Sequence, residues 1–464
     1  MTPVKAITLA AVLVLPTLAL AQDAEDAVEA RHGFMTMLGI NMGQLAGMAK
    51  GEIAYDEAAA SLAAANIVAA RAQYRIQRAE RFPQIDAPGR AGSSDTGSGT
   101  VTNPGTGAPV TTGGGRGSFA ANLGITAFEV DLVGRVASLT RAQQERYFAS
   151  EAAARAVRLT LVGDIADAWL THAADASLLK IARDTAVSAE RSVRLTRARL
   201  EGGIAPRTDL RQAEQVLETA RADVAEQTAA LAQDVNALRL LVGADIDPAT
   251  LPAAIEQAAP TVAELPAGVD SRILLRRPDV VQAEYELRAA NAEIGAARAA
   301  LFPTISLTGL LGFASDALTS LFDRGAFNWS GTANAAYPIF RAGAGRAGVE
   351  LSQAQRDAAL ATYERAIQSA FRELADALAV RGTIGERLRA TTANTAAAAD
   401  TYRLADARYR GGVDAFLSSL DAQRSLYTAQ RQLVTVRLAQ AGNLVTLYRS
   451  LGGDQLDPPR PDRP

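Results

Sequence analysis

Three side chains late in the sequence have types and spacing suited to handling charge. Leu417, Asp421 and Arg424 follow the pair Gly411-Gly412 and are separated from one another by four and three residues. Residues at these intervals share one face of a helix. An exposed carboxylate and guanidinium can attract ions or groups of opposite charge, but they can also simply pair with each other, which contributes about 0.3 kcal/mol. The residues alone leave both interpretations open.

The sequence contains no set of residues suited to catalysis. The sequence contains two histidines, His32 and His172, which lie far apart, and it contains no cysteine. It also lacks a nucleophile motif, a phosphate-binding loop and a cluster of metal ligands. We therefore predict that the protein is not an enzyme and that it binds no metal and no cofactor.

Long helices must position the charged residues. Residues 134–200 are almost free of glycine and proline and rich in helix-forming residues, and residues 344–410 form a segment of matching length. Each segment is followed by a glycine pair, Gly202-Gly203 or Gly411-Gly412. A return helix is expected after each pair, at residues 208–241 and 415–451. Each half of the chain is thus predicted to contain a helical hairpin.

A second pattern predicts strands. Residues 327–335 alternate strictly between apolar or small side chains and polar ones, and residues 119–126 and 304–313 show the same period of two. Such strands fit a lipid-facing sheet with a polar lumen, and they fit equally a soluble sheet packed on one face. Two strand pairs cannot close a barrel, which needs about eight strands. A barrel would therefore require an oligomer.

Composition and the N-terminal residues limit the location. The chain has 464 residues with 47 basic and 50 acidic side chains, and this balance argues against a nucleic-acid partner. Residues 1–21 have the pattern of a Sec-type signal peptide, ending in Ala19-Leu20-Ala21. No later apolar run reaches about 18 residues, so we expect no transmembrane helix. Without cysteine we expect no disulfide and no lipid anchor.

The two halves of the chain repeat the same order of motifs. The residues Arg298 to Pro303, which end in Phe302-Pro303, correspond in spacing to Arg78 to Pro83. A repeat of this length indicates duplicated structure. We expect a first repeat at 61–242, a connector at 243–270, a second repeat at 271–451 and a disordered tail at 452–464. Residues 90–117, rich in glycine, serine and threonine, are expected to form a long, exposed hairpin loop.

From about residue 63 to 454 the sequence resembles the TolC-like outer-membrane efflux factors, and within them the NodT-type branch that serves RND-type pumps. The motifs that carry the resemblance are Leu274-Leu275-Arg276-Arg277-Pro278-Asp279, Trp329-Ser330, Pro338-Ile339-Phe340 and Leu447-Tyr448-Arg449-Ser450-Leu451-Gly452-Gly453. The segment from Phe128 to Arg135 is similar to the branch's entry to its first long helix. Phe128 and Val133 stand there in place of the usual aromatic residues.

The resemblance implies a fold and a set of partners. The fold is mainly α-helical with a small β part, and a two-repeat protomer builds a trimeric α-helical barrel continued into a 12-stranded transmembrane β-barrel. Such a homotrimer lies in the outer membrane with a periplasmic extension. It works with a periplasmic membrane-fusion adaptor and an inner-membrane RND-type pump. The implied function is a passive exit duct for small molecules, gated at its periplasmic end.

The resemblance also implies roles for particular residues. At the closed aperture, Leu417 would form a hydrophobic ring, Asp421 an acidic ring, and Arg424 would bind carboxylates that latch neighbouring helices. The adaptor would dock at the periplasmic tip turns. The tip-turn residues are Gly202, Gly203, Gly411 and Gly412. A plain helix-ending turn is the alternative interpretation of both glycine pairs.

Residues 22–60 depart from this family and resemble the opening helix and loop of a cytochrome c′. That family attaches haem through a Cys-x-x-Cys-His motif, which this cysteine-free sequence lacks, so we expect no haem. A fused or mis-assembled reading frame would explain the segment. Two alternatives to the exit duct remain, namely a periplasmic haem- or gas-binding protein with a helical extension and a soluble coiled-coil scaffold.

Overall fold

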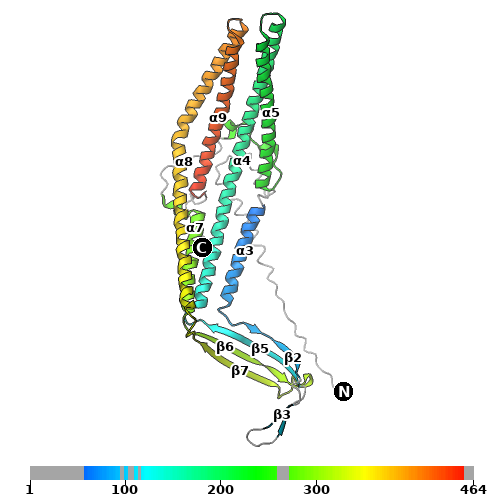
Figure 1. Ribbon diagram of the computed structural model, residues 1–464, viewed down its shortest axis with the longest axis vertical. Helices are drawn as coiled ribbons and strands as arrows, with labels where there is room; N and C mark the ends of the chain where they lie inside the picture. The colour runs from blue at the N-terminus through cyan, green and yellow to red at the C-terminus, as the bar shows by residue number, and fades with distance from the viewer. Residues whose placement is uncertain (1–56, 95–98, 103–108, 113–115, 259–270, 454–464) are drawn as a thin grey trace, which may run out of the picture. The chain divides into compact units, whose positions relative to one another are not determined.

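The computed structural model divides the protein into two compact units. It describes residues 57–94, 99–102, 109–112, 116–258 and 271–453. The expected signal peptide, most of the cytochrome-like segment and nearly all of the expected tail lie outside these residues. Of the described residues, the first unit comprises those within 57–60, 158–273 and 371–453, and the second comprises those within 61–157 and 274–370. Two helices, α4 (Arg135–Glu201) and α8 (Ala344–Arg410), run through both units as continuous elements (Figure 1).

The first unit consists of two helical hairpins. Helix α4 is followed by α5 (Arg207–Val242), and α8 is followed by α9 (Phe416–Ser450). The bounds of all four helices agree with the predicted helices to within one or two residues. Helix α5 ends at Gly243, whose φ of 73° is left-handed and whose N–H donates to the carbonyl of Arg239. Such a glycine cap ends a helix with little backbone strain.

Part of the connector is packed into the first unit. The segment 243–270 was predicted as a connector between the repeats, and its described part contains η1 (Pro248–Thr250) and α6 (Ile255–Ala258). Ile255 is completely buried in a cluster with Leu170 of α4 and Val434 of α9. The N–H of Ile255 donates to Ser177 Oγ at 2.9 Å, and Glu256 pairs with Arg437. The connector therefore holds the two hairpins against each other.

The second unit contains the sheet. Helices α3 (Glu57–Ala79) and α7 (Pro278–Ala299) each lead through a Phe-Pro pair into a strand, as the repeat predicted. The sheet strands are β1 (Ile85–Asp86), β2 (Gly89–Ser94), β5 (Arg116–Val130), β6 (Thr304–Ser315) and β7 (Phe327–Ala336), all antiparallel. The remaining short elements are β3 (Gly99–Thr102), β4 (Pro109–Thr112), η3 (Ser271–Arg276) and η4 (Leu318–Ser320).

The sheet is four strands wide because β1 and β2 pair with successive stretches of β5. Strand β6 lies between β5 and β7, so β1 and β2 form one open edge and β7 forms the other. The prediction of a hairpin loop over residues 90–117 is wrong at both ends. Residues 89–94 pair with residues 116–121, and β3 pairs with β4 between them. Small and hydroxyl side chains favoured a loop in the sequence, but they are also compatible with strands that are joined by backbone hydrogen bonds.

The predicted alternation produces two unlike faces. The register places Leu311 opposite Trp329 and Phe313 opposite Phe327, whereas Thr308 lies opposite Thr332 on the other face. Adjacent residues of a strand point to opposite faces, so one face is apolar and the other polar. On the apolar face Trp329 is 75% exposed. None of the helices in the described residues combines the length and hydrophobicity that a membrane span requires.

Two helices of the second unit present exposed apolar stripes. On α3 the stripe consists of Leu62, Ala65, Ala69, Ala72 and Ile76, and on α8 it consists of Ala347, Leu351, Ala354, Ala358 and Ala361. All ten residues are exposed, and both stripes follow alternating intervals of three and four residues. Such spacing is typical of helices that pack along a continuous seam.

Candidate functional site

The two hairpins of the first unit end in the same kind of turn. Gly203 and Gly412 both have φ of 74°. In the first turn, Gly203 N–H donates to Leu200 and Ile204 N–H donates to Arg199; in the second, the equivalent bonds join Gly412 to Tyr409 and Val413 to Arg408. This pair of bonds defines a Schellman motif. The structure confirms the predicted helix-ending turns, whereas docking at the turns stays a prediction.

An arginine that the sequence analysis did not single out joins the two turns. Arg199 Nη2 donates to the carbonyls of Tyr409 and Arg410 at 3.0 and 3.1 Å. Its guanidinium also lies 4.4 Å from the centre of the Tyr409 ring, and that ring packs against Phe416 at 5.2 Å. Tyr409 and Phe416 are 4% and 3% exposed, and burial raises the pKa of Tyr409. The contacts form one small core at the ends of the hairpins.

The internal repeat explains why Arg199 reaches across. Its counterpart in the second repeat, Arg408, forms an exposed two-bond ion pair with Asp414 at 2.6 and 2.9 Å, which lowers the pKa of Asp414. In the first repeat Ala205 stands where Asp414 stands in the second. Arg199 therefore has no local carboxylate at that position, and its guanidinium binds the other hairpin instead. Aligning the two repeats would have revealed this difference.

We expect Arg199→Gln to loosen the ends of the hairpins. The change removes two charge-assisted hydrogen bonds and a cation–π contact, which at a half-buried position contribute about 1–2 kcal/mol. Hydrogen exchange at the C-terminal turn of α8 should accelerate by roughly tenfold. Arg408→Gln, which removes the exposed pair, is the matched control and should change exchange little. Equal exchange rates in wild type and Arg199→Gln would contradict the assignment.

Leu417, Asp421 and Arg424 lie on one exposed face of α9, as their spacing predicted. Leu417 is 52% exposed. Within the part of the chain that the structure describes, neither the Asp421 nor the Arg424 side chain makes a hydrogen bond or ion pair. The simple Asp421–Arg424 pair is therefore not formed in the protomer. Both charged groups remain available to bind other groups.

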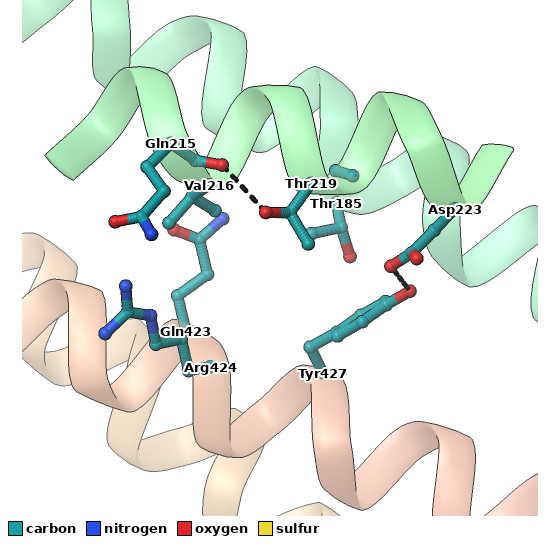
Figure 2. A pocket seen from close by; sticks show the side chains of 9 residues that line it. Thr185, Gln215, Val216, Thr219, Asp223, Gln423, Arg424 and Tyr427 are labelled. Carbon is teal, nitrogen blue, oxygen red and sulfur yellow. Dashed lines mark hydrogen bonds between the residues drawn. The ribbon is translucent and has the colours of Figure 1, made fainter. Parts of the chain in front are cut away.

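Arg424 borders a small cleft between α5 and α9. The cleft has a volume of about 100 Å³ and is lined by Thr185, Gln215, Val216, Thr219, Ala220, Asp223, Gln423, Arg424 and Tyr427. Figure 2 shows the Gln423 side chain rising from α9 toward Val216, with the Arg424 guanidinium beside it. Gln423 is 6% exposed, and its Nε2 has no partner among the described residues. The cleft thus presents an unpaired amide donor beside an unpaired guanidinium.

A tyrosine closes the other end of this cleft. The Tyr427 hydroxyl donates to Asp223 Oδ2 at 2.5 Å, linking α9 to α5 (Figure 2). Burial, followed by the hydrogen bond and charge of Asp223, raises the pKa of Tyr427. Tyr427 therefore remains a hydrogen-bond donor throughout the physiological pH range. The two residues lie 204 positions apart, and no sequence pattern pointed to their contact.

The histidines do not assemble a metal site in the described residues. His172 is 9% exposed and hydrogen-bonded to the backbone of Pro252, and burial lowers its pKa. The described residues contain no group of three or more histidine, cysteine, aspartate or glutamate side chains placed to hold a metal ion. His32 lies outside the described residues. His172 is a core histidine of the first unit.

Asp175, near His172, makes stability depend on pH. Burial, then the Asp234 carboxylate, raises the pKa of Asp175 to about 6. The folded protein therefore keeps this proton to higher pH than the unfolded chain does, and stability falls as pH rises from about 4 through 6. We expect Asp175→Asn to melt a few degrees above wild type at pH 7.5 and equally at pH 4. The control Asp184→Asn, at an exposed position on α4, should not raise the melting temperature. A melting temperature of Asp175→Asn below that of wild type at pH 7.5 would contradict the assignment.

Comparison with known proteins identifies relatives over most of the chain. The family model described as outer membrane efflux protein matches residues 59–244 and 269–453. The antibiotic efflux pump outer membrane protein ArpC of Pseudomonas putida is 44% identical over 399 residues, covering 84% of this chain and 79% of that protein. Outer membrane protein OprJ of Pseudomonas aeruginosa is 39% identical over 392 residues, covering 84% and 80%.

Solved structures agree with the sequence relatives. The open state of the Neisseria gonorrhoeae MtrE outer membrane channel superposes with a TM-score of 0.75 and 32% identity, covering 86% of each chain. CusC superposes with a TM-score of 0.77 and 34% identity, covering 85% of this chain and 89% of that one. A cytochrome c′ model also matches residues 26–85, weakly, and overlaps the efflux match from residue 59.

Proposed function

The chain belongs to the outer membrane efflux protein family, and we propose that it forms the trimeric outer-membrane duct through which an RND-type efflux system releases small molecules. The sheet with one exposed apolar face and one polar face is the observation that carries the proposal. In a membrane barrel the polar face of such a sheet would line an aqueous lumen and the apolar face would contact lipid, so each face would have a solvent that suits it. The match along both halves of the chain favours this function over a haem protein.

Closure of the sheet requires more than one chain. Strand β7 has a partner on one side only, and so does the edge formed by β1 and β2. Unpaired strand edges are costly in lipid, because water cannot satisfy their backbone groups there. Three copies joined edge to edge would supply a closed ring of 12 strands, within the range of known barrels.

The exposed helix stripes support the same arrangement. Helix α3 leads into β1, and β7 leads into α8, so each open sheet edge continues into a helix with an exposed apolar stripe. A head-to-tail contact that joins β7 to the next copy's β1 and β2 also brings α8 beside the next copy's α3. Repetition of one heterologous contact closes a ring when the rotation allows it. The same rotation between neighbouring copies would therefore form both the strand interface and the helix interface.

Within this trimer, Leu417, Asp421 and Arg424 form the periplasmic constriction. Three copies of Asp421 would create a cation-attracting ring, and Leu417 would resist wetting beside it. The unpaired Arg424, with the Gln423 amide beside it, supplies donors for a carboxylate of the neighbouring protomer. The turns at Gly202, Gly203, Gly411 and Gly412 would contact a periplasmic membrane-fusion adaptor that is bound to an RND-type pump.

Complementation tests the function. A host that has an intact adaptor and pump but lacks its outer-membrane duct should regain resistance to an exported compound when it expresses this protein. Purified protein should also conduct ions in planar bilayers. A folded protein that enters the outer membrane yet neither conducts nor restores export would refute the proposal. Recovery of the protein only in the soluble periplasmic fraction would favour the coiled-coil scaffold.

A further inference from the structure

Four loops join the helices to one end of the sheet. They follow α3, β5, α7 and β7, and they lie together because Val130 pairs with Ile305 and Thr304 pairs with Ala336 at that end of the ladder. All four loops belong to the second unit. Side chains from distant parts of the chain therefore surround the same end of the sheet.

The loops expose unusually large apolar side chains. Phe82, Leu132, Phe302, Ile339 and Phe340 are 61, 70, 52, 89 and 86% exposed. Five such residues in four adjoining loops are more than the scattered apolar side chains of an ordinary surface. They lie at the end where the sheet, with its exposed apolar face, joins the helices.

Four exposed arginines lie close to these residues in the sequence. Arg81, Arg298, Arg341 and Arg346 are exposed, and none forms an ion pair or side-chain hydrogen bond with a described residue. Three carboxylates of this region already have partners. Glu129 binds Arg135, Asp131 accepts from the N–H of Ala137, and Glu80 accepts from Gln77. None of these three carboxylates therefore pairs with any of the four guanidinium groups.

We propose that these four arginines, with the apolar side chains beside them, form a binding belt for anionic phospholipid headgroups. An arginine at a membrane interface lays its stem along the acyl region and holds its guanidinium at phosphate level. A guanidinium also binds a phosphate through two parallel hydrogen bonds. Exposed apolar side chains at the end of a sheet that itself has an exposed apolar face favour a lipid surface over a soluble partner. The proposal rests on the proposed outer-membrane location.

Native mass spectrometry of purified trimers in mixed micelles provides the test. Wild-type trimers should retain phosphatidylglycerol at least about tenfold more tightly than phosphatidylcholine, since each arginine near an anionic surface contributes to binding. Replacement of Arg81, Arg298, Arg341 and Arg346 by glutamine should abolish that preference. The matched control replaces four exposed arginines of the first unit, Arg183, Arg194, Arg207 and Arg387, by glutamine and should keep it.

Two outcomes would overturn the belt. The first is a wild type without preference for phosphatidylglycerol, or a quadruple variant that retains it. The second is a variant whose trimers dissociate in phosphatidylcholine micelles, which would make the arginines contacts between protomers. Conductance of wild-type trimers in phosphatidylcholine bilayers is measured separately. A non-conducting wild type would therefore refute the duct without bearing on lipid preference.

Discussion

Replacing Asp421 and Arg424 together with alanine is expected to raise the conductance of reconstituted trimers and to reduce their preference for cations. Neither side chain forms a hydrogen bond or ion pair within the described protomer, so their removal should leave α9 intact. An exposed ion pair contributes about 0.5–1 kcal/mol, and three-fold symmetry would provide three copies. Their combined loss shifts a closed–open equilibrium by roughly tenfold or more.

Single variants separate the two roles. Arg424→Ala should raise conductance while keeping cation selectivity, and Asp421→Ala should lower selectivity because the acidic ring is lost. Ser425→Ala, an exposed neighbour on α9, is the control and should behave as wild type. Conductance and reversal potential are recorded in planar bilayers at two salt concentrations. Unchanged values in the double variant would show that the constriction lies elsewhere.

The sequence predicted the long elements well because their signals are local and repeated. Segments poor in glycine and proline form helices, and the left-handed conformation of Gly203 and Gly412 sets where α4 and α8 end. Alternation over residues 327–335 predicted β7 because the sheet keeps two unlike faces. The strand β2 was missed because its glycine and serine residues have low strand propensity. It forms a strand because its backbone pairs with β5, a contact that its own sequence does not indicate.

The candidate site was predicted only in part. The shared face of Leu417, Asp421 and Arg424 follows from helix periodicity alone. The Tyr427–Asp223 bond and the buried Gln423 amide depend on how α9 packs against α5, which no local pattern specifies. The role of Arg199 could have been predicted in part, because a comparison of the repeats shows that Ala205 replaces the carboxylate of Asp414 and leaves Arg199 without that partner. Its partner in the other hairpin could not be named from that comparison.

Placing a carboxylate in the α3 stripe is expected to prevent trimer formation. In the proposed trimer, Ala69→Glu would bury an uncompensated charge at each of the three interfaces, at a cost of roughly 3–5 kcal/mol per charge. The α3 helix itself should persist, since glutamate is a good helix former and Ala69 is exposed in the protomer. The oligomeric state in detergent should change from trimer to monomer. Ala64→Glu, which changes another exposed position on α3 that lies outside the stripe, should remain trimeric.

A disulfide crosslink tests whether α8 of one copy packs against α3 of the next. Because the chain contains no cysteine, only the introduced cysteines can form it. Ala69 lies ten residues before the end of α3 at Ala79, and Ala354 lies ten residues after the start of α8 at Ala344. Both positions are thus at a similar distance from the sheet, and an Ala69→Cys, Ala354→Cys variant should form disulfides between chains. Crosslinked dimers and trimers are expected on oxidation. The pair Ala64→Cys, Ala354→Cys should crosslink poorly, and equal yields from both pairs would refute the packing of α8 against the next copy's α3.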